Sequence, residues 1–132
     1  MNKKEVELYI EKHQSNQERS SSFIDYLYLM MDKYGFDKAS DLYNKANISR
    51  QLWSSLISEK SHPSLEICIK LVFALKLNNR ECKLFLKKAG FTLSSASKYS
   101  LIIRYALEHN IYYLNELNKI LEEFGYQDSL IY

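Results

Sequence analysis

Glycine and proline are scarce in this sequence, with three glycines and one proline among 132 residues. Tight turns depend on these residue types, so a β-sandwich or β-barrel, which needs many turns, is disfavoured. Apolar residues make up 46% of the chain, enough for the core of one ordinary domain. Segments with the 3.6-residue period of an amphipathic helix run through most of the chain. The sequence therefore predicts an all-α fold.

Cysteine is also rare, and Cys68 and Cys82 are not spaced as a metal or redox pair. We expect both to be buried, reduced thiols. Charged residues occur throughout the first twelve residues, unlike in a signal peptide, and no apolar run reaches the roughly 18 residues of a membrane span. These absences indicate a cytoplasmic protein that does not bind a membrane.

A strong excess of either charge is missing as well. The formal net charge is +2, with a pI near 8.4. A polybasic nucleic-acid-binding protein would be more positive, so any DNA-binding face must be local.

The apolar periodicity divides the chain into three regions. We expect residues 1–21 to form a short N-terminal helix and a polar linker, residues 22–78 a domain of short helices, and residues 79–132 a helical C-terminal extension. The expected helices span about residues 3–13, 23–34, 38–46, 50–58, 65–77, 79–89, 98–109 and 114–124. Helix ends are expected at Gly35, Asn47, Gly90, Asn110 and Gly125, residue types suited to that position.

The stretch LYNKANISRQLWSSLISEKSHPSL, residues 42–65, carries the most information about function. Two helices that cross closely need a small residue at the crossing and a turn residue that tolerates positive φ. Ala46 and Asn47 meet these needs, while Ile48, Trp53 and Leu56 supply the packing. The segment therefore predicts two short helices joined by a tight turn.

Four polar side chains remain on the outer side of the second of these helices. Arginine binds guanine bidentately and glutamine binds adenine. Ser49 would cap the helix, whose N-terminus favours a phosphate. The outer side chains are Arg50, Gln51, Ser54 and Ser55.

The same stretch resembles the helix-turn-helix of lambda-repressor-like (Cro/C1-type, XRE) proteins. The matching residues are Leu42, Lys45, Ala46, Ile48, Ser49, Arg50, Trp53 (where the family has Ile or Val), Leu56, Lys60, Pro63, Ser64 and Leu65. The resemblance marks residues 22–78 as the helix-turn-helix domain. The resemblance implies a five-helix module whose recognition helix, residues 49–58, enters the major groove of double-stranded DNA. It also implies a bacterial or phage transcriptional regulator. By position, Arg50, Gln51 and Ser55 match base-contacting sites, and Ser49 and Lys60 match backbone-contacting sites.

Two positions depart from the family pattern. Ala39 stands where the family has a phosphate-binding glutamine, and Glu59 stands where it has a glycine after the recognition helix. Glu59 is less suited to positive φ and adds a negative charge near the expected DNA. These departures favour an alternative function, a protein-interaction module (an adaptor, an antitoxin-like protein or an inhibitor) built on the same fold.

Chemistry-bearing constellations are missing elsewhere. The hydroxyl-rich residues 92–97 lack a GxSxG or glycine-rich motif and are interpreted as caps and turns. The three histidines show no metal-ligand spacing, so we expect no enzyme, no metal and no cofactor. The C-terminal part resembles a helical extension that follows such modules in small bacterial proteins. Its tyrosines, including Tyr112 and Tyr113, indicate a homodimer through the C-terminal helices.

Overall fold

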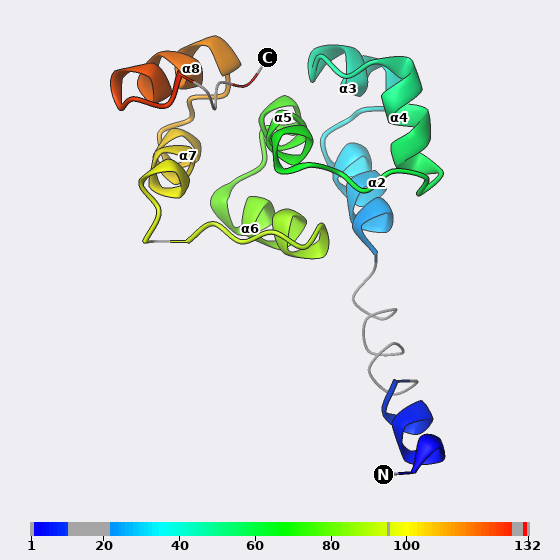
Figure 1. The fold of residues 1–132 in the computed structure, drawn as a ribbon. Coiled ribbons are helices and arrows are strands. Elements are labelled where there is room, and N and C mark those ends of the chain that lie inside the picture. The colour runs from blue at the N-terminus through cyan, green and yellow to red at the C-terminus, as the bar shows by residue number, and fades with distance from the viewer. Residues whose placement is uncertain (1, 11–21, 95, 128–130, 132) are drawn as a thin grey trace.

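The computed structural model describes residues 2–10, 22–94, 96–127 and 131, and no β-strand occurs among them. A helix covers residues 3–10, and seven labelled helices follow it (Figure 1). They are α2 (Phe23–Lys33), α3 (Ala39–Lys45), α4 (Arg50–Ile57), α5 (Leu65–Leu75), α6 (Asn79–Lys88), α7 (Lys98–Glu108) and α8 (Leu114–Glu123). The all-α prediction is confirmed for this part of the chain.

The N-terminal segment is partly described. Its helix covers residues 3–10, and every residue from 2 to 10 is exposed. The end of the predicted helix and the linker up to residue 21 lie outside the described residues. Ser22 caps α2 and forms a capping box with Asp25.

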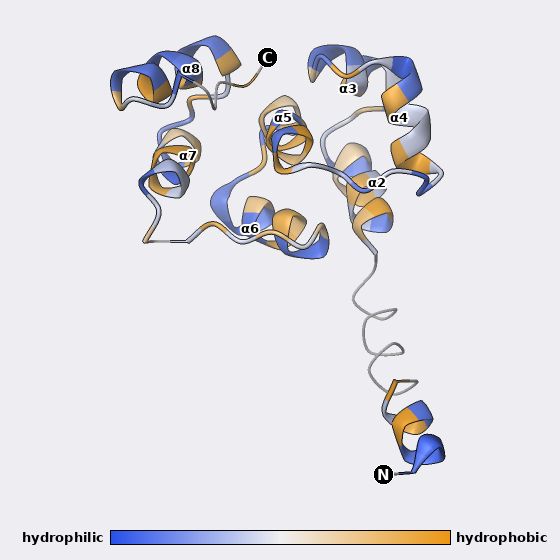
Figure 2. Ribbon diagram, in the orientation of Figure 1, coloured by the Kyte–Doolittle hydropathy of each residue, from blue (hydrophilic) through white to orange (hydrophobic). Residues whose placement is uncertain are grey.

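Helix α5 lies at the centre of the fold. It packs against α3 on one side and α6 on another, and α6 also contacts α2 and α7. Residues 68–75 of α5 are all buried, and the helix is largely orange in Figure 2, the colour of hydrophobic residues. A helix that is hydrophobic on nearly all sides belongs in the interior. Figure 1 shows α4 and the α7–α8 pair on opposite sides of α5.

The hydrophobic core continues without a break across residue 78, the predicted domain boundary. Leu27 and Leu42 come from before this boundary, and Phe85, Ile103 and Leu117 come from after it. Helix α6 packs on both α2 and α5, so the extension shares a core with the preceding helices. Cys68 and Cys82 are free and buried in this core, as predicted. Burial raises the pKa of each thiol to about 12.

The predicted helix ends are confirmed, with one difference. Gly35, Asn47, Gly90, Asn110 and Gly125 all have positive φ. Helix α5, expected to run to Leu77, ends at Leu75 because Lys76 adopts the left-handed conformation, with φ 58° and ψ 47°. No helix among the described residues is long and apolar enough to cross a membrane.

Candidate nucleic-acid interface at α4

A tight turn connects α3 to α4. The N–H of Ile48 donates to the carbonyl of Tyr43 (2.8 Å) and that of Asn47 to Asn44 (3.1 Å), the hydrogen-bond pair of a Schellman motif. Asn47 holds the left-handed conformation with φ 56°. The Ser49 hydroxyl then accepts from the Leu52 N–H (3.1 Å) and caps α4. This cap stabilises the start of α4 by about 1 kcal/mol.

The inner side of α4 is held by the core. Trp53 is 7% exposed, and its ring lies 5.8 Å from that of Tyr43 on α3. Leu56 is also buried, and Ala46, which is fully buried, lies just before the turn. A side chain larger than alanine would meet a closely packed core at position 46. The packing role predicted for Ala46, Ile48, Trp53 and Leu56 agrees with their burial.

The outer side of α4 carries the predicted site residues. Ser49, Arg50, Gln51 and Ser54 are exposed, and Ser55 is half-buried. Lys60 is exposed as well but lies beyond the C-terminus of the helix. Leu52, which was not among the predicted residues, is 37% exposed and lies within the same stretch. The outer surface of α4 is therefore polar with one apolar side chain.

The C-terminal end of α4 has a left-handed residue where the family pattern has glycine. Glu59 has φ 61°, so the backbone keeps the left-handed conformation even though glycine is missing. The N–H of Lys60 donates to the Ser55 carbonyl (2.9 Å) and that of Glu59 to Leu56 (3.1 Å), again a Schellman pair. A non-glycine residue in this conformation costs about 1–2 kcal/mol.

The charge of this part of the surface is nearly balanced. Residues 37–60 hold four basic and three acidic residues. They are Lys38, Lys45, Arg50, Lys60, Asp37, Asp41 and Glu59. Burial, and to a lesser degree the charge of Lys76, lowers the pKa of Lys45, whose Nζ lies 5.6 Å from the centre of the Phe36 ring. Lys45 is thus turned toward the loop before α3.

Comparisons with known proteins found no match to this chain among protein-family models, curated proteins or solved structures. The resemblance of residues 42–65 to repressor-type proteins therefore rests on those residues alone. Ala39, at the position of the family's glutamine, is half-buried at the start of α3.

Proposed function

We propose that this chain is a bacterial or phage transcriptional regulator that binds double-stranded DNA through α4 in the major groove. One observation carries the proposal: the exposed polar side of α4 lies opposite a side held by the core. Arg50 and Gln51 are the residue types that bind guanine and adenine through paired hydrogen bonds. Ser49 caps a helix N-terminus, whose N–H groups favour a phosphate.

Access to α4 also supports the proposal. The α7–α8 pair lies across α5 from α4, so it leaves the outer side of α4 uncovered (Figure 1). A helix that enters the major groove must project from the protein surface without another element in front of it. Lys60, at the exposed C-terminal end of α4, would contact the DNA backbone.

A homodimer formed by the C-terminal helices extends this proposal. Two-fold symmetry would set two copies of α4 against successive major grooves. Leu101 and Tyr105, which are one turn apart on α7, are exposed, as are Tyr113 and Phe124 at the two ends of α8. Exposed apolar side chains of this kind favour burial against a second copy.

Selection of duplexes from a random pool, followed by gel shift at a stated salt concentration, tests the proposal. The protein should enrich a defined sequence and bind it at least 100-fold more tightly than random DNA. Arg50→Ala and Gln51→Ala should each weaken binding to the enriched sequence by about 5- to 100-fold and relax preference at one base position. Lys60→Ala should weaken binding to all sequences alike and reduce the salt dependence.

Lys119→Ala is the matched control, because Lys119 is an exposed base on α8. It should leave the preference for the enriched sequence unchanged. The proposal is wrong if no duplex binds more tightly than random DNA. It is equally wrong if the double variant Arg50→Ala, Gln51→Ala binds like the wild type.

The exposed Leu52 favours a second function, a protein-interaction module on the same face. An apolar side chain amid the polar residues of α4 suits a protein partner, and Glu59 opposes a DNA phosphate. In this case Leu52→Ser should abolish recovery of a defined partner from the native host. Sequence-specific DNA binding that survives Leu52→Ser would argue against this function.

A further inference from the structure

Four exposed side chains form a line along the outer side of α7. They are Lys98, Leu101, Tyr105 and Glu108, and we call them the α7 stripe. Their spacings of three, four and three residues place them within about 80° of the helix circumference. The opposite side of the helix is held in the core by its buried apolar residues, which are Ile102, Ile103, Ala106 and Leu107. Because a coiled-coil contact line alternates in the same way, the α7 stripe has the spacing of a helix-helix contact.

The centre of the α7 stripe is apolar. Leu101 is 45% exposed and Tyr105 is 50% exposed, one helical turn further along. The Tyr105 ring stacks on the His109 ring, with 3.9 Å between the ring centroids and 22° between the planes. His109 also donates from Nδ1 to the main-chain carbonyl oxygen of Tyr105 (2.9 Å). The stack restricts the tyrosine ring, so burying this ring against a partner costs less side-chain entropy.

The two ends of the α7 stripe carry opposite charges. Lys98 is the first residue of α7 and Glu108 is the last. A base at the N-terminus of a helix and an acid at its C-terminus both oppose the helix dipole, so neither charge stabilises the isolated helix. Lys98 forms no ion pair within the described part of the chain. Glu108 accepts from the side-chain amide of Asn79 through Oε1 (2.8 Å), which uses one of its two carboxylate oxygens.

The α7 stripe is complementary to itself when two copies run antiparallel. Its spacings are the same when read from either end of the helix. In an antiparallel pair, Lys98 therefore faces Glu108 of the second copy, and Leu101 faces Tyr105. In a parallel pair, Lys98 would face Lys98 and Glu108 would face Glu108, which brings like charges together. The order of charges thus favours the antiparallel pair and opposes the parallel one.

The position of α7 in the fold leaves room for a second copy. Helix α7 packs against α6 and α8, and it lies across α5 from α4 (Figure 1). A second copy that contacts the α7 stripe therefore leaves the outer side of α4 uncovered.

We propose that the α7 stripe binds the α7 stripe of a second copy of this chain, antiparallel and across a two-fold axis. This inference rests on the homodimer proposed above and assigns its contact and its register. Leu101 of each copy packs against Tyr105 of the other, and a Lys98–Glu108 ion pair forms at each end. Two short helices bury less than the roughly 800 Å² per partner of a standard interface, so the dimer dissociates on dilution.

Sedimentation velocity of the full chain, without DNA and over a range of micromolar concentrations, tests the proposal. The wild type should pass from monomer to dimer as its concentration rises. Lys98→Glu should weaken the dimer about tenfold, because both attractive pairs become repulsive. Lys98→Glu combined with Glu108→Lys should restore the dimer, because the exchanged charges again face their opposites. Lys38→Glu, at an exposed base before α3, makes the same change in net charge and should leave the dimer unchanged.

A second pair of variants tests the apolar centre of the α7 stripe. Leu101→Ser should weaken the dimer about tenfold, since it removes an apolar contact from each copy. Leu29→Ser is the control, because Leu29 is 56% exposed on α2 and lies outside the stripe. Both variants should keep the circular dichroism spectrum of the wild type. A dimer that neither Lys98→Glu nor Leu101→Ser weakens would overturn this proposal without contradicting a homodimer formed by another surface.

Disulfide trapping tests the register of the two helices. The variants Lys98→Cys and Glu108→Cys are oxidised separately and as a mixture. In the antiparallel pair, position 98 of one copy lies beside position 108 of the other. The two copies of position 98 are about 15 Å apart along the helix axis, too far for a disulfide. The mixture should therefore form a covalent dimer, whereas each variant alone should not.

The native cysteines do not interfere with this experiment. Cys68 and Cys82 are buried, and burial raises the pKa of each thiol to about 12. A covalent dimer formed by Lys98→Cys alone, or by Glu108→Cys alone, would show a parallel pair and overturn the proposal. Because no step uses DNA, the result is independent of the proposed DNA binding.

Discussion

Single residues set the backbone at several helix ends. Outside glycine, the described residues with positive φ are Asn47, Glu59, Lys76 and Asn110. Asparagine tolerates this conformation because its side chain bonds locally, whereas glutamate and lysine do not gain in this way. Glu59 and Lys76 are thus the two described positions where the backbone conformation opposes the residue type.

Glu59→Gly should raise the free energy of unfolding by about 0.5–1 kcal/mol. Glycine removes the strain of the positive φ, which raises stability. It also loses more conformational entropy on folding, which offsets part of this gain. Lys76→Gly should give a similar increase, while Asn47→Gly should change stability less. Urea denaturation followed by circular dichroism measures all three. A loss of stability in both Glu59→Gly and Lys76→Gly would show that strain is not the dominant effect at these positions.

At the scale of elements, the seven helices α2–α8 end in the same way. Each helix is followed by a residue in the left-handed conformation. The N–H of the next residue donates to the carbonyl of the residue five positions before it. The residues that donate are Phe36, Ile48, Lys60, Leu77, Phe91, Ile111 and Tyr126. Six of these are apolar and suit the hydrophobic contact that accompanies a Schellman motif. Lys60, at the end of α4, is the polar exception, which agrees with a solvent-facing or ligand-facing end.

A polar contact fastens α2 to α6. Glu81, 7% exposed, accepts from Lys33 Nζ and from the Tyr34 hydroxyl, both at 2.5 Å. It also accepts from the Asn78 N–H (3.1 Å) in the capping box of α6. Burial is the largest single influence and raises the pKa of Glu81, but the three hydrogen bonds and the charge of Lys33 together lower it below its ordinary value. The fold therefore favours the charged carboxylate.

The Glu81 contact should make stability depend on pH. A lowered pKa in the folded state adds stability that is fully present above the unfolded pKa of about 4.3 and is lost as pH falls through the folded value. Glu81→Gln should lower the free energy of unfolding by about 1–3 kcal/mol at pH 7. The difference from the wild type should shrink below about pH 4.3.

Urea denaturation at pH 7, 4.5 and 3 measures this difference. Glu123→Gln, an exposed glutamate on α8, is the control and should show no comparable change. A difference between Glu81→Gln and the wild type that stays constant down to pH 3 would contradict the favoured charged state.

At the scale of the whole molecule, the C-terminal part is tied into the core by its last described residue. The side-chain amide of Asn118 on α8 donates to the Ile131 carbonyl (2.7 Å) and accepts from the Ile131 N–H (2.8 Å). Ile131 is only 1% exposed. The Asn118 side chain thus forms hydrogen bonds with both the N–H and the carbonyl of Ile131, a buried residue outside any helix.

Asn118→Leu should lower the free energy of unfolding by about 2 kcal/mol. Leucine is close to asparagine in size but leaves the N–H and the carbonyl of Ile131 without partners. Asn115→Leu, at an exposed position on the same helix, should change stability by less than about 0.5 kcal/mol. Urea denaturation of both variants, with the Ile131 amide signal followed by NMR, measures the effect. An unchanged Ile131 signal in Asn118→Leu would show that this residue is held by other contacts.

Local sequence determined much of the helical framework and the residues that α4 exposes. Short-range patterns suffice to predict helix periods, helix caps and helix ends, because each depends on residues within one or two turns. Examples are the caps Ser22, Ser49 and Asn78 and the helix end at Gly35. The outer position of Arg50 and Gln51 follows from the same period once Trp53 and Leu56 are placed inside.

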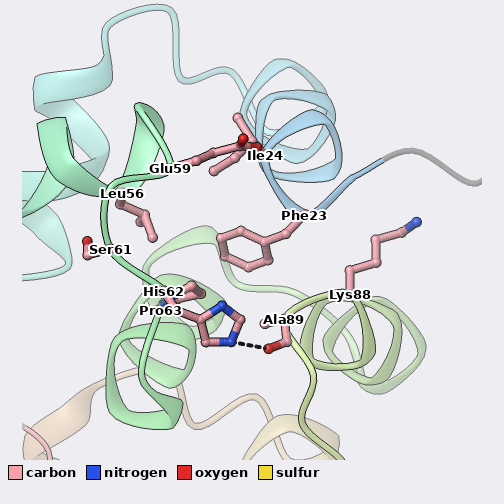
Figure 3. Close-up of a pocket in the computed structure, with 9 residues that line it drawn as sticks. All are labelled: Phe23, Ile24, Leu56, Glu59, Ser61, His62, Pro63, Lys88 and Ala89. Carbon is pink, nitrogen blue, oxygen red and sulfur yellow. Dashed lines mark hydrogen bonds between the residues drawn. The ribbon is translucent and has the colours of Figure 1, made fainter. Parts of the chain in front are cut away.

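Only the tertiary structure decided features that join distant segments. Three features join residues that are many positions apart in the sequence. They are the hydrogen bonds from α2 to Glu81, the hydrogen bonds between Asn118 and Ile131, and the pocket that Phe23, His62 and Ala89 help to line (Figure 3). The left-handed conformation of Lys76 also depends on tertiary packing. Its neighbours Leu75 and Leu77 are both buried, and their burial imposes the turn although lysine disfavours this conformation. These features follow from the packing of the helices around α5, because contacts between distant residues leave no periodic signal in the sequence.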